Sequence, residues 1–180
     1  MRDWNILVTV LRGAGHERHV LRELKFLGEF HGTEFRDVCI GWVEDAAGFL
    51  ETLLYAVEAG EPWTRDLARV IPIELTFHFT PETLVAELQQ AVSPLIQRMD
   101  NGSVYVRLER RGLAGELMSH EVERDVADHL FALAQAQGKE MHTKFQDPDY
   151  IVLAETLGHE CGVALITREQ RQRSPFVQAR

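Results

Sequence analysis

Short apolar runs alternate with amphipathic stretches over the first 80 residues, and this alternation constrains the fold more than any other feature of the sequence. The run at 4–11 is rich in β-branched residues and predicts a buried strand, and the run at 67–79 predicts another extended segment. Between them, 29–43 predicts either a strand, a turn and a second strand, or one long bent strand. Apolar residues at helical spacing predict helices over 16–27 and 45–59.

The resulting order is β-α-β-β-α-β, which is the order of the ferredoxin-like split unit, a sheet with two helices on one face. Pro72 lies inside the last extended run and has no N–H to donate to a sheet. It therefore indicates an edge strand or a bulge at that point. The sequence predicts an α/β (α+β) protein whose N-terminal ferredoxin-like domain spans residues 1–79.

The second half predicts a further α/β domain over residues 80–180 that opens with a helix. Thr80 is a candidate N-cap, with Pro81 at the first helical position. Ser93-Pro94 is expected to kink or split this helix. The other expected elements are a strand at 103–110, a helix capped by Ser119 that ends at Gly138, and a hairpin of strands 150–157 and 163–167.

The acidic composition limits the class of protein and its partners. The chain has 19 Lys+Arg and 28 Asp+Glu, which gives a formal net charge of −9. A nucleic-acid coat protein is normally basic, and we expect no DNA partner. No apolar run is long enough to span a membrane and no secretory signal is visible, so we expect no membrane partner. The two cysteines, Cys39 and Cys161, fit a reducing compartment, and we expect the cytoplasm.

No motif in the sequence indicates a catalytic centre, a metal ion or a cofactor. Gly13–Gly15 opens a helix as in a dinucleotide loop, but Arg18 stands where the third glycine is needed. His16 and His19 lie about one helical turn apart and have no third ligand at a fixed spacing. Cys161 lies near a histidine, but no further group is placed to orient that histidine as a base. We therefore expect no catalytic residues, no metal site and no cofactor.

Three basic groupings are candidates for contact with a phosphate backbone. They are a ridge on the first helix formed by Arg18, Arg22 and Lys25, a cluster at a strand end formed by Arg107, Arg110 and Arg111 beside Tyr105, and a basic tail from Arg168 to Arg180. Each grouping can equally be a solvated face with local ion pairs, because Glu17, Glu23 and Glu109 lie close by in the sequence.

Several stretches of the second half carry a resemblance to a known family. They are SVYVRLERRG at 103–112, the helix that contains Ser119, Val122, Arg124, Val126 and Ala127-Asp128, DPDYIV at 147–152 and CGVALI at 161–166. In order and spacing, the segment 101–167 resembles the THUMP domain, the RNA-binding module of thiouridine synthases, tRNA methylases and pseudouridine synthases. The helix at 80–99 fits the helical lead-in of that family. The N-terminal half is similar to the ferredoxin-like domain that often accompanies THUMP.

The resemblance implies binding of structured tRNA, often near its acceptor end, so that a catalytic domain reaches the base to be modified. Because the sequence ends soon after the THUMP-like segment, we expect a stand-alone protein similar to the tRNA-binding adaptors of tRNA cytidine acetylation. That likeness implies two partners, tRNA and a tRNA-modifying enzyme in trans, an acetyltransferase. One alternative is a subunit or minimal form of a tRNA-modifying enzyme of the thiolation, methylation or pseudouridylation type, with its catalytic domain on another chain. Another is an interaction module without RNA binding.

The expected RNA footprint lies mainly on the second half. Arginine forks suit phosphate groups, and Arg107 and Arg111 are expected to share a strand face with Tyr105. The full set of expected RNA-binding residues is Tyr105, Arg107, Arg110, Arg111, Arg124, Lys144, Arg18, Arg22 and Lys25. Neither half is basic, since the first 70 residues hold 8 basic and 12 acidic side chains and the rest hold 11 and 16. We therefore expect modest affinity from this chain alone, with the partner enzyme supplying the rest.

Overall fold

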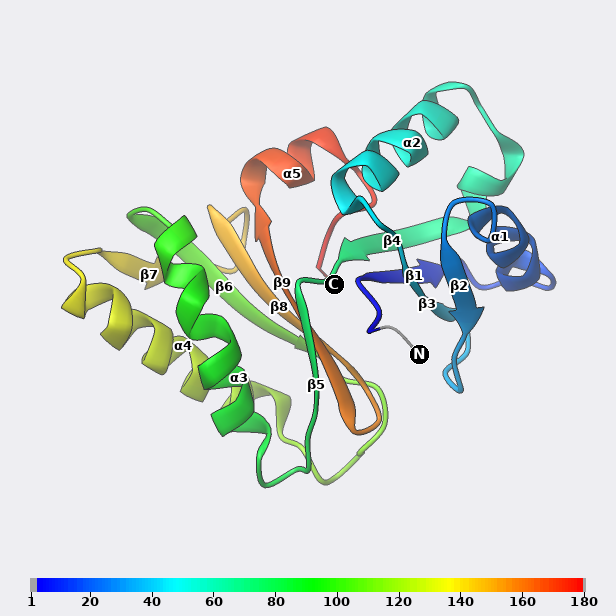
Figure 1. Ribbon diagram of the computed structural model, residues 1–180. Coiled ribbons are helices and arrows are strands. Elements are labelled where there is room, and N and C mark those ends of the chain that lie inside the picture. The colour runs from blue at the N-terminus through cyan, green and yellow to red at the C-terminus, as the bar shows by residue number, and fades with distance from the viewer. Residues whose placement is uncertain (1–2, 180) are drawn as a thin grey trace. The chain divides into compact units, whose positions relative to one another are not determined.

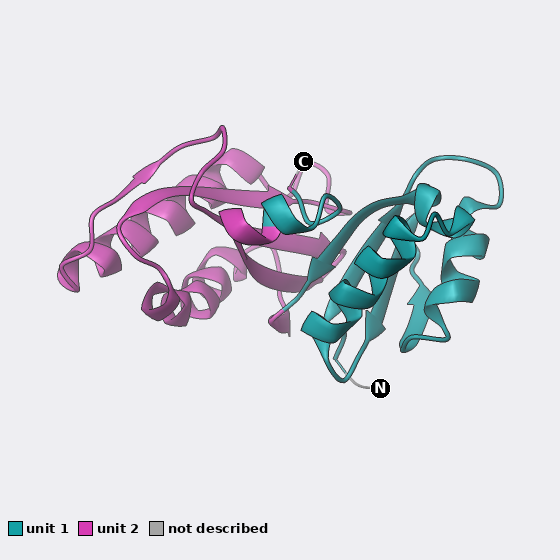
Figure 2. Cartoon of the chain, turned by 90° about the horizontal axis from the view of Figure 1, so that it is seen from above, with its two compact units in different colours: residues 1–73, 171–178 teal, residues 74–170, 179–180 magenta. Residues whose placement is uncertain are grey.

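The chain divides into two compact units in a computed structural model that describes residues 3–179 (Figure 2). Unit 1 comprises 1–73 and 171–178, and unit 2 comprises 74–170 with the last two residues of the chain. Arg180, part of the predicted basic tail, lies outside the described residues. Over the described range, none of the helices has the length and apolar character needed to traverse a lipid bilayer.

Unit 1 is built on a four-stranded antiparallel sheet with the strand order β2-β3-β1-β4 (Figure 1). Its elements are β1 (Ile6–Val10), α1 (His16–Leu24), β2 (Glu29–Gly32), β3 (Val38–Trp42), α2 (Ala46–Glu58), the 3-10 helix η1 (Pro62–Asp66) and β4 (Leu67–Pro72). The predicted β-α-β-β-α-β order is confirmed. Pro72 lies at the end of β4, which is the last strand of this order, so the expectation of an edge strand is correct.

The two helices of unit 1 each bury one side. Asp45 caps α2, because its carboxylate accepts a hydrogen bond from the backbone N–H of Gly48 at 3.0 Å. Phe49 of α2 stacks on Phe30 of β2, with ring centroids 5.5 Å apart. α1 buries Val20 fully, and its basic residues lie on the exposed side.

The run at 67–79 is two strands in two different sheets, and its interpretation as one extended segment was wrong. β4 belongs to unit 1, whereas β5 (Leu75–His78) pairs with a strand of unit 2. The backbone N–H of Ile73 bonds within unit 1, and that of the next residue, Glu74, donates to the Val163 carbonyl at 2.9 Å within unit 2. The alternation of apolar and polar residues along the segment could not reveal this change from one sheet to the other, because that alternation does not depend on which sheet a strand joins.

The segment that follows α5 (Arg168–Arg173) lies along β4 and belongs to unit 1. The Val70 N–H donates to the Phe176 carbonyl at 2.9 Å, and Arg69 Nε donates to the Gln178 carbonyl at 2.7 Å. Phe176 is only 6% exposed. This segment therefore contributes both hydrogen bonds and apolar packing to unit 1, although it is about 100 residues from β4 in the sequence.

The predicted basic tail is only partly solvated. Its start forms the short helix α5, which the sequence did not predict. Arg168 donates a hydrogen bond to Asp149 at 2.7 Å. Arg173 forms an ion pair with Glu51. These two arginines of the tail thus neutralise carboxylates of the protein itself.

Replacing Phe176 by alanine is expected to destabilise unit 1 by about 3–5 kcal/mol, because a buried aromatic ring is lost and a cavity remains. The chain has three tryptophans, Trp4, Trp42 and Trp63, and all lie in unit 1, so tryptophan fluorescence in urea follows this unit. The control is Gln178→Ala, whose exposed side chain should change the unfolding free energy by less than about 0.5 kcal/mol. Equal midpoints for the two variants would contradict the packing role of Phe176.

Unit 2 packs α3 and α4 on one face of a five-stranded mixed sheet with the order β5-β9-β8-β6-β7 (Figure 1). Its further elements are α3 (Leu84–Val92), the 3-10 helix η2 (Ser93–Arg98), β6 (Gly102–Glu109), α4 (Ser119–Ala136), β7 (Met141–Thr143), β8 (Tyr150–Leu157) and β9 (Glu160–Thr167). β6 runs parallel to β7 and β8, and β8 and β9 form the predicted antiparallel hairpin. The predicted split of the helix at Ser93-Pro94 is confirmed.

The core of unit 2 lies between the sheet and the two helices. Val104 and Leu108 of β6 are at most 2% exposed and pack in the same cluster as Leu130 of α4. The intervening residues Tyr105 and Arg107 are only partly buried. The alternation along β6 therefore anchors the strand in the core and leaves part of these two side chains available at the surface.

Two helix caps and one strand differ from the predictions. α3 begins at Leu84, because the residues before it form a turn in which the Thr80 N–H bonds to the Thr83 hydroxyl at 2.8 Å. Met118, and not Ser119, is the N-cap of α4, without a side-chain cap bond. β7 was not predicted, because three residues are too few to show a periodic pattern.

The turn before β8 is fixed by the side chain of Asp149. Its carboxylate accepts hydrogen bonds from the Ser103 N–H at 2.8 Å, from the Ser103 hydroxyl at 3.0 Å and from Arg168 at 2.7 Å. These bonds, of which the Ser103 N–H makes the largest contribution, hold the pKa of Asp149 below its usual value.

Asp149 is therefore expected to make the free energy of unfolding depend on pH. Its contribution is present above the unfolded-state pKa of about 3.9 and is lost as the pH falls through the lower folded-state pKa. Urea unfolding of Asp149→Asn, followed by far-UV circular dichroism, should show a smaller loss of stability between about pH 4 and pH 2 than the natural chain. An equal loss of stability in the two proteins would show that Asp149 does not contribute to the acid sensitivity of the fold.

Candidate nucleic-acid interface

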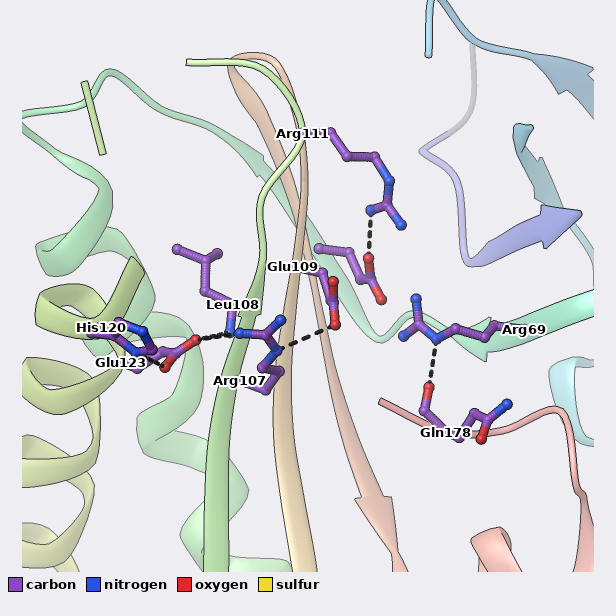
Figure 3. Close-up of polar contacts among 9 residues, drawn as sticks. Arg69, Arg107, Leu108, Glu109, Arg111, His120, Glu123 and Gln178 are labelled. Atoms are coloured by element: carbon purple, nitrogen blue, oxygen red, sulfur yellow. Dashed lines mark hydrogen bonds and ion pairs between the residues drawn. The ribbon is translucent and has the colours of Figure 1, made fainter. Parts of the chain in front are cut away.

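The guanidinium of Arg107 lies between two carboxylates (Figure 3). Its Nε is 3.2 Å from Glu109 Oε1, and its Nη1 is 3.2 Å from Glu123 Oε1. The same Glu123 oxygen accepts the backbone N–H of Leu108 at 3.0 Å, which fixes the carboxylate against β6. The Arg107 side chain is 24% exposed, so its charge is largely neutralised within the protein.

Arg111 forms a buried ion pair, and Arg110 binds the backbone. Arg111 Nη1 is 2.5 Å from Glu155 Oε2, with 13% of the arginine side chain and none of the glutamate side chain exposed. The backbone N–H of Arg111 also donates a hydrogen bond to the Thr156 hydroxyl at 3.0 Å. The Arg110 guanidinium donates to the carbonyl of Gly112. The ion pairs that the sequence left open as an alternative to phosphate binding are thus present for Arg107 and Arg111.

Tyr105 lies beside a pocket between β6, β7 and α4. Its ring packs edge to face on Phe145, with centroids 5.4 Å apart and an interplanar angle of 84°. The pocket has a volume of about 210 Å³. Its lining residues are Tyr105, Val106, His120, Glu123, Arg124, Ala127, Asp128, Thr143 and Phe145. Burial raises the pKa of the Tyr105 hydroxyl, although nearby Arg107 opposes this effect, so the phenol stays protonated at neutral pH.

Of two further expected residues, the structure places Arg124 in the pocket lining and Lys144 next to that lining along the chain. Arg124 is exposed on α4 and lines the pocket. Lys144 is exposed and stands between the lining residues Thr143 and Phe145, with its backbone N–H bonded to the Val104 carbonyl at 3.2 Å. One cation, Arg124, therefore lies in the wall of an aromatic pocket, and a second, Lys144, is adjacent to that wall along the chain. Cations near aromatic rings suit phosphate and base contacts with RNA.

The first basic ridge lies on α1 in unit 1. Arg18, Arg22 and Lys25 are all exposed, and Arg22 makes only a loose ion pair of 3.8 Å with Glu23. Phe26, directly after the ridge, is 82% exposed. The cations of this ridge can therefore bind an anion from solution without first losing a buried contact.

The paired histidines of α1 contact a carboxylate, and both cysteines are buried. His16 and His19 lie 3.7 and 3.4 Å from the Asp66 carboxylate. In the part of the chain that the structure describes, no group of three or more His, Cys, Asp or Glu side chains is arranged to hold a metal ion. Burial raises the pKa of Cys39 to about 12 and also raises that of Cys161, so both thiols remain protonated and poorly nucleophilic.

Sequence reasoning missed Phe145, His120 and Glu123 as neighbours of the candidate interface. Phe145 is 71% exposed beside Lys144, and this aromatic–basic pair was the available sequence signal. Glu123 lies 16 residues from Arg107, and only the packing of α4 on β6 brings the two together.

The fold is similar to several solved structures. The chain matches PH1313 from Pyrococcus horikoshii Ot3 over 92% of its length, with a TM-score of 0.61 and 9% identity. It matches TrmN from Thermus thermophilus over 89% of its length, with a TM-score of 0.60 and 20% identity. It matches a 4-thiouridine synthetase, solved as an RNA complex with bound ATP, over 91% of its length, with a TM-score of 0.59 and 11% identity. It spans 55%, 44% and 41% of these three chains, respectively.

Neither a protein-family model nor a curated protein matches the sequence. The structural neighbours include THUMP-containing proteins, so the chain has a THUMP-like fold, and the predicted α/β class is confirmed. The likeness extends over both units, since it covers 89% or more of the chain in each of the three matches. At these low identities, it establishes the fold, and function has to be argued from the surface.

Proposed function

We propose that this chain binds RNA, that its ligand is folded tRNA, and that it presents the tRNA to a modification enzyme on another chain. The observation that carries the proposal is the THUMP-like fold, shared over 91% of the chain with a 4-thiouridine synthetase solved as an RNA complex. The resemblance of segment 101–167 to the THUMP domain supports the same ligand. An acetyltransferase is the partner that the sequence resemblance implies.

The proposed contact surface consists first of exposed cations. Arg124 lines the pocket beside Tyr105, and Lys144 is exposed next to Phe145 in the sequence. Neither has a carboxylate partner among the contacts of the described residues. Arg18, Arg22 and Lys25 form the second group, on unit 1. We assign these side chains to phosphate contacts, because an exposed cation can exchange water and counterions for phosphate at low cost.

The arginines of the strand end have a different part in this proposal. Arg107 holds Glu123 and Glu109, and Arg111 holds the buried Glu155. Arg110 donates to the Gly112 carbonyl. We assign to them the positioning of β6 and α4, with direct phosphate contact limited to their exposed edges.

The acidic surface fits an adaptor better than an independent RNA-binding protein. A net charge of −9 repels polyanions at a distance, so attraction has to come from local groups of cations. Binding by two proteins at once raises the overall affinity without new contacts on either one. An enzyme that supplies part of the tRNA interface would therefore compensate for modest affinity here.

The adaptor role is tested by nucleoside analysis. Folded tRNA is incubated with the purified chain and with acetyl, methyl or sulfur donors, then digested and analysed by mass. We expect no new nucleoside from the chain alone. A capture experiment from cell extract should yield tRNA together with a tRNA-modifying enzyme. A modified nucleoside made by the chain alone would overturn the adaptor role and leave RNA binding standing.

A further inference from the structure

The pocket of about 210 Å³ has walls that suit a flat aromatic group. Tyr105 and Phe145 meet edge to face on one side, and Val106 and Ala127 add apolar surface. Pockets that enclose drug-sized ligands occupy ~300–1,000 Å³, so this one fits a single ring system rather than a whole nucleotide. Phe145 is 71% exposed, which leaves most of its ring free to stack on a ligand.

The polar side chains that line the pocket include two carboxylates and three groups that can donate a hydrogen bond, His120, Arg124 and Thr143. Glu123 and Asp128 both line it and both present carboxylate oxygens. Glu123 is held in place by the Leu108 N–H at 3.0 Å and by Arg107 at 3.2 Å. Because these hydrogen bonds fix the orientation of the carboxylate, it can distinguish a ligand group that donates a hydrogen bond from one that does not.

The charges at the mouth of the pocket favour a ligand with a phosphate attached. Arg124 lines the pocket from α4, and exposed Lys144 stands next to Phe145. The ring-binding walls therefore include one cation and lie next to a second along the chain, and a base and its flanking phosphates are likewise adjacent in a nucleic-acid strand.

We propose that this pocket binds one unpaired base of an RNA strand, and that it prefers a base with an exocyclic amino group to uracil. The base stacks on Phe145 and Tyr105, its amino group donates to Glu123 or Asp128, and the flanking phosphates contact Arg124 and Lys144. Carboxylates accept hydrogen bonds from the cytosine amino group, whereas uracil presents a carbonyl at the same position and is repelled. The inference rests on the proposed RNA binding and adds the type of nucleotide that unit 2 reads.

The test compares two single-stranded RNAs of equal length, oligo(C) and oligo(U), which differ in this amino group. Binding to the full chain is measured by fluorescence anisotropy at one fixed, low salt concentration. We expect oligo(C) to bind at least about fivefold more tightly than oligo(U). Asp128→Asn should narrow this ratio, because an amide can also donate a hydrogen bond to the uracil carbonyl. Asp128 is exposed, so the substitution should leave the fold intact.

The stacking contact is tested with two matched variants. Phe145→Ala should weaken oligo(C) binding by about 5- to 150-fold, the range for loss of one base–aromatic stack. Tyr55→Ala is the control, because Tyr55 is 69% exposed on α2 and lies outside every proposed contact. Circular dichroism of each variant should match that of the natural chain.

The outcomes separate this inference from the proposed function. Equal binding of oligo(C) by Phe145→Ala and Tyr55→Ala, or equal affinity of the natural chain for oligo(C) and oligo(U), overturns the base-reading pocket. If folded tRNA still binds in either case, the proposed function stands and the pocket serves another class of ligand. If neither oligomer nor folded tRNA binds at low salt, RNA binding itself is rejected.

Discussion

Replacing Arg111 by methionine is expected to lower the free energy of unfolding by about 3–5 kcal/mol. Its guanidinium lies 2.5 Å from Glu155, whose side chain is fully buried. The variant removes the Arg111 charge and leaves a buried carboxylate without this partner. The change should appear as a lower urea midpoint in far-UV circular dichroism of the full chain.

The matched control is another arginine ion pair of unit 2. Arg98 donates two hydrogen bonds of 2.7 Å to Glu74, but 55% of its side chain is exposed. Arg98→Met should therefore cost no more than about 1 kcal/mol. Similar midpoints for Arg98→Met and Arg111→Met would show that the buried pair does not stabilise the strand end, and would return Arg111 to the candidates for direct RNA contact.

Removing two of the proposed phosphate-binding cations of unit 2 together is expected to flatten the salt dependence of tRNA binding. In Arg124→Gln/Lys144→Gln, the slope of log K against log salt should become less steep by about 2, since each lost phosphate contact changes it by about 1. Both side chains are exposed, so the fold should be unaffected. Binding titrations at several salt concentrations give the slope directly.

The control for this double variant is Arg65→Gln/Arg98→Gln. It removes the same formal charge from two exposed arginines that lie outside the proposed contacts. Its slope should stay close to that of the natural chain, because salt dependence reports phosphates neutralised rather than net charge. If both double variants flatten the slope equally, Arg124 and Lys144 have no special part in RNA binding.

Local patterns were enough to predict the element order of unit 1 and most of unit 2. Apolar spacing gave α1 and α2, and Pro94 gave the break between α3 and η2. Features that depend on distant partners were missed. β5 continues directly from β4 but joins the other sheet, and the segment around Phe176 bonds to β4 across more than 100 residues. No local property of these segments distinguishes their partners.

The candidate site could be predicted in part for the same reason. Tyr105 and Arg124 were expected from the resemblance, and β6 and α4 bring them to one pocket. The ion pairing of Arg107 with Glu123 depends on how α4 packs on β6, so the sequence left it as one of two alternatives. Phe145 follows a strand too short to recognise from periodicity, and its position beside Tyr105 required the structure.

RNA binding by this chain is tested by measuring its affinity for folded tRNA over about 50–200 mM salt. We expect a complex at low salt whose log K falls linearly with log salt, with a slope of about −2 or steeper if Arg124 and Lys144 each contact a phosphate. Absence of a complex at the lowest salt, or an affinity that does not change with salt, would rule out RNA binding through phosphate contacts.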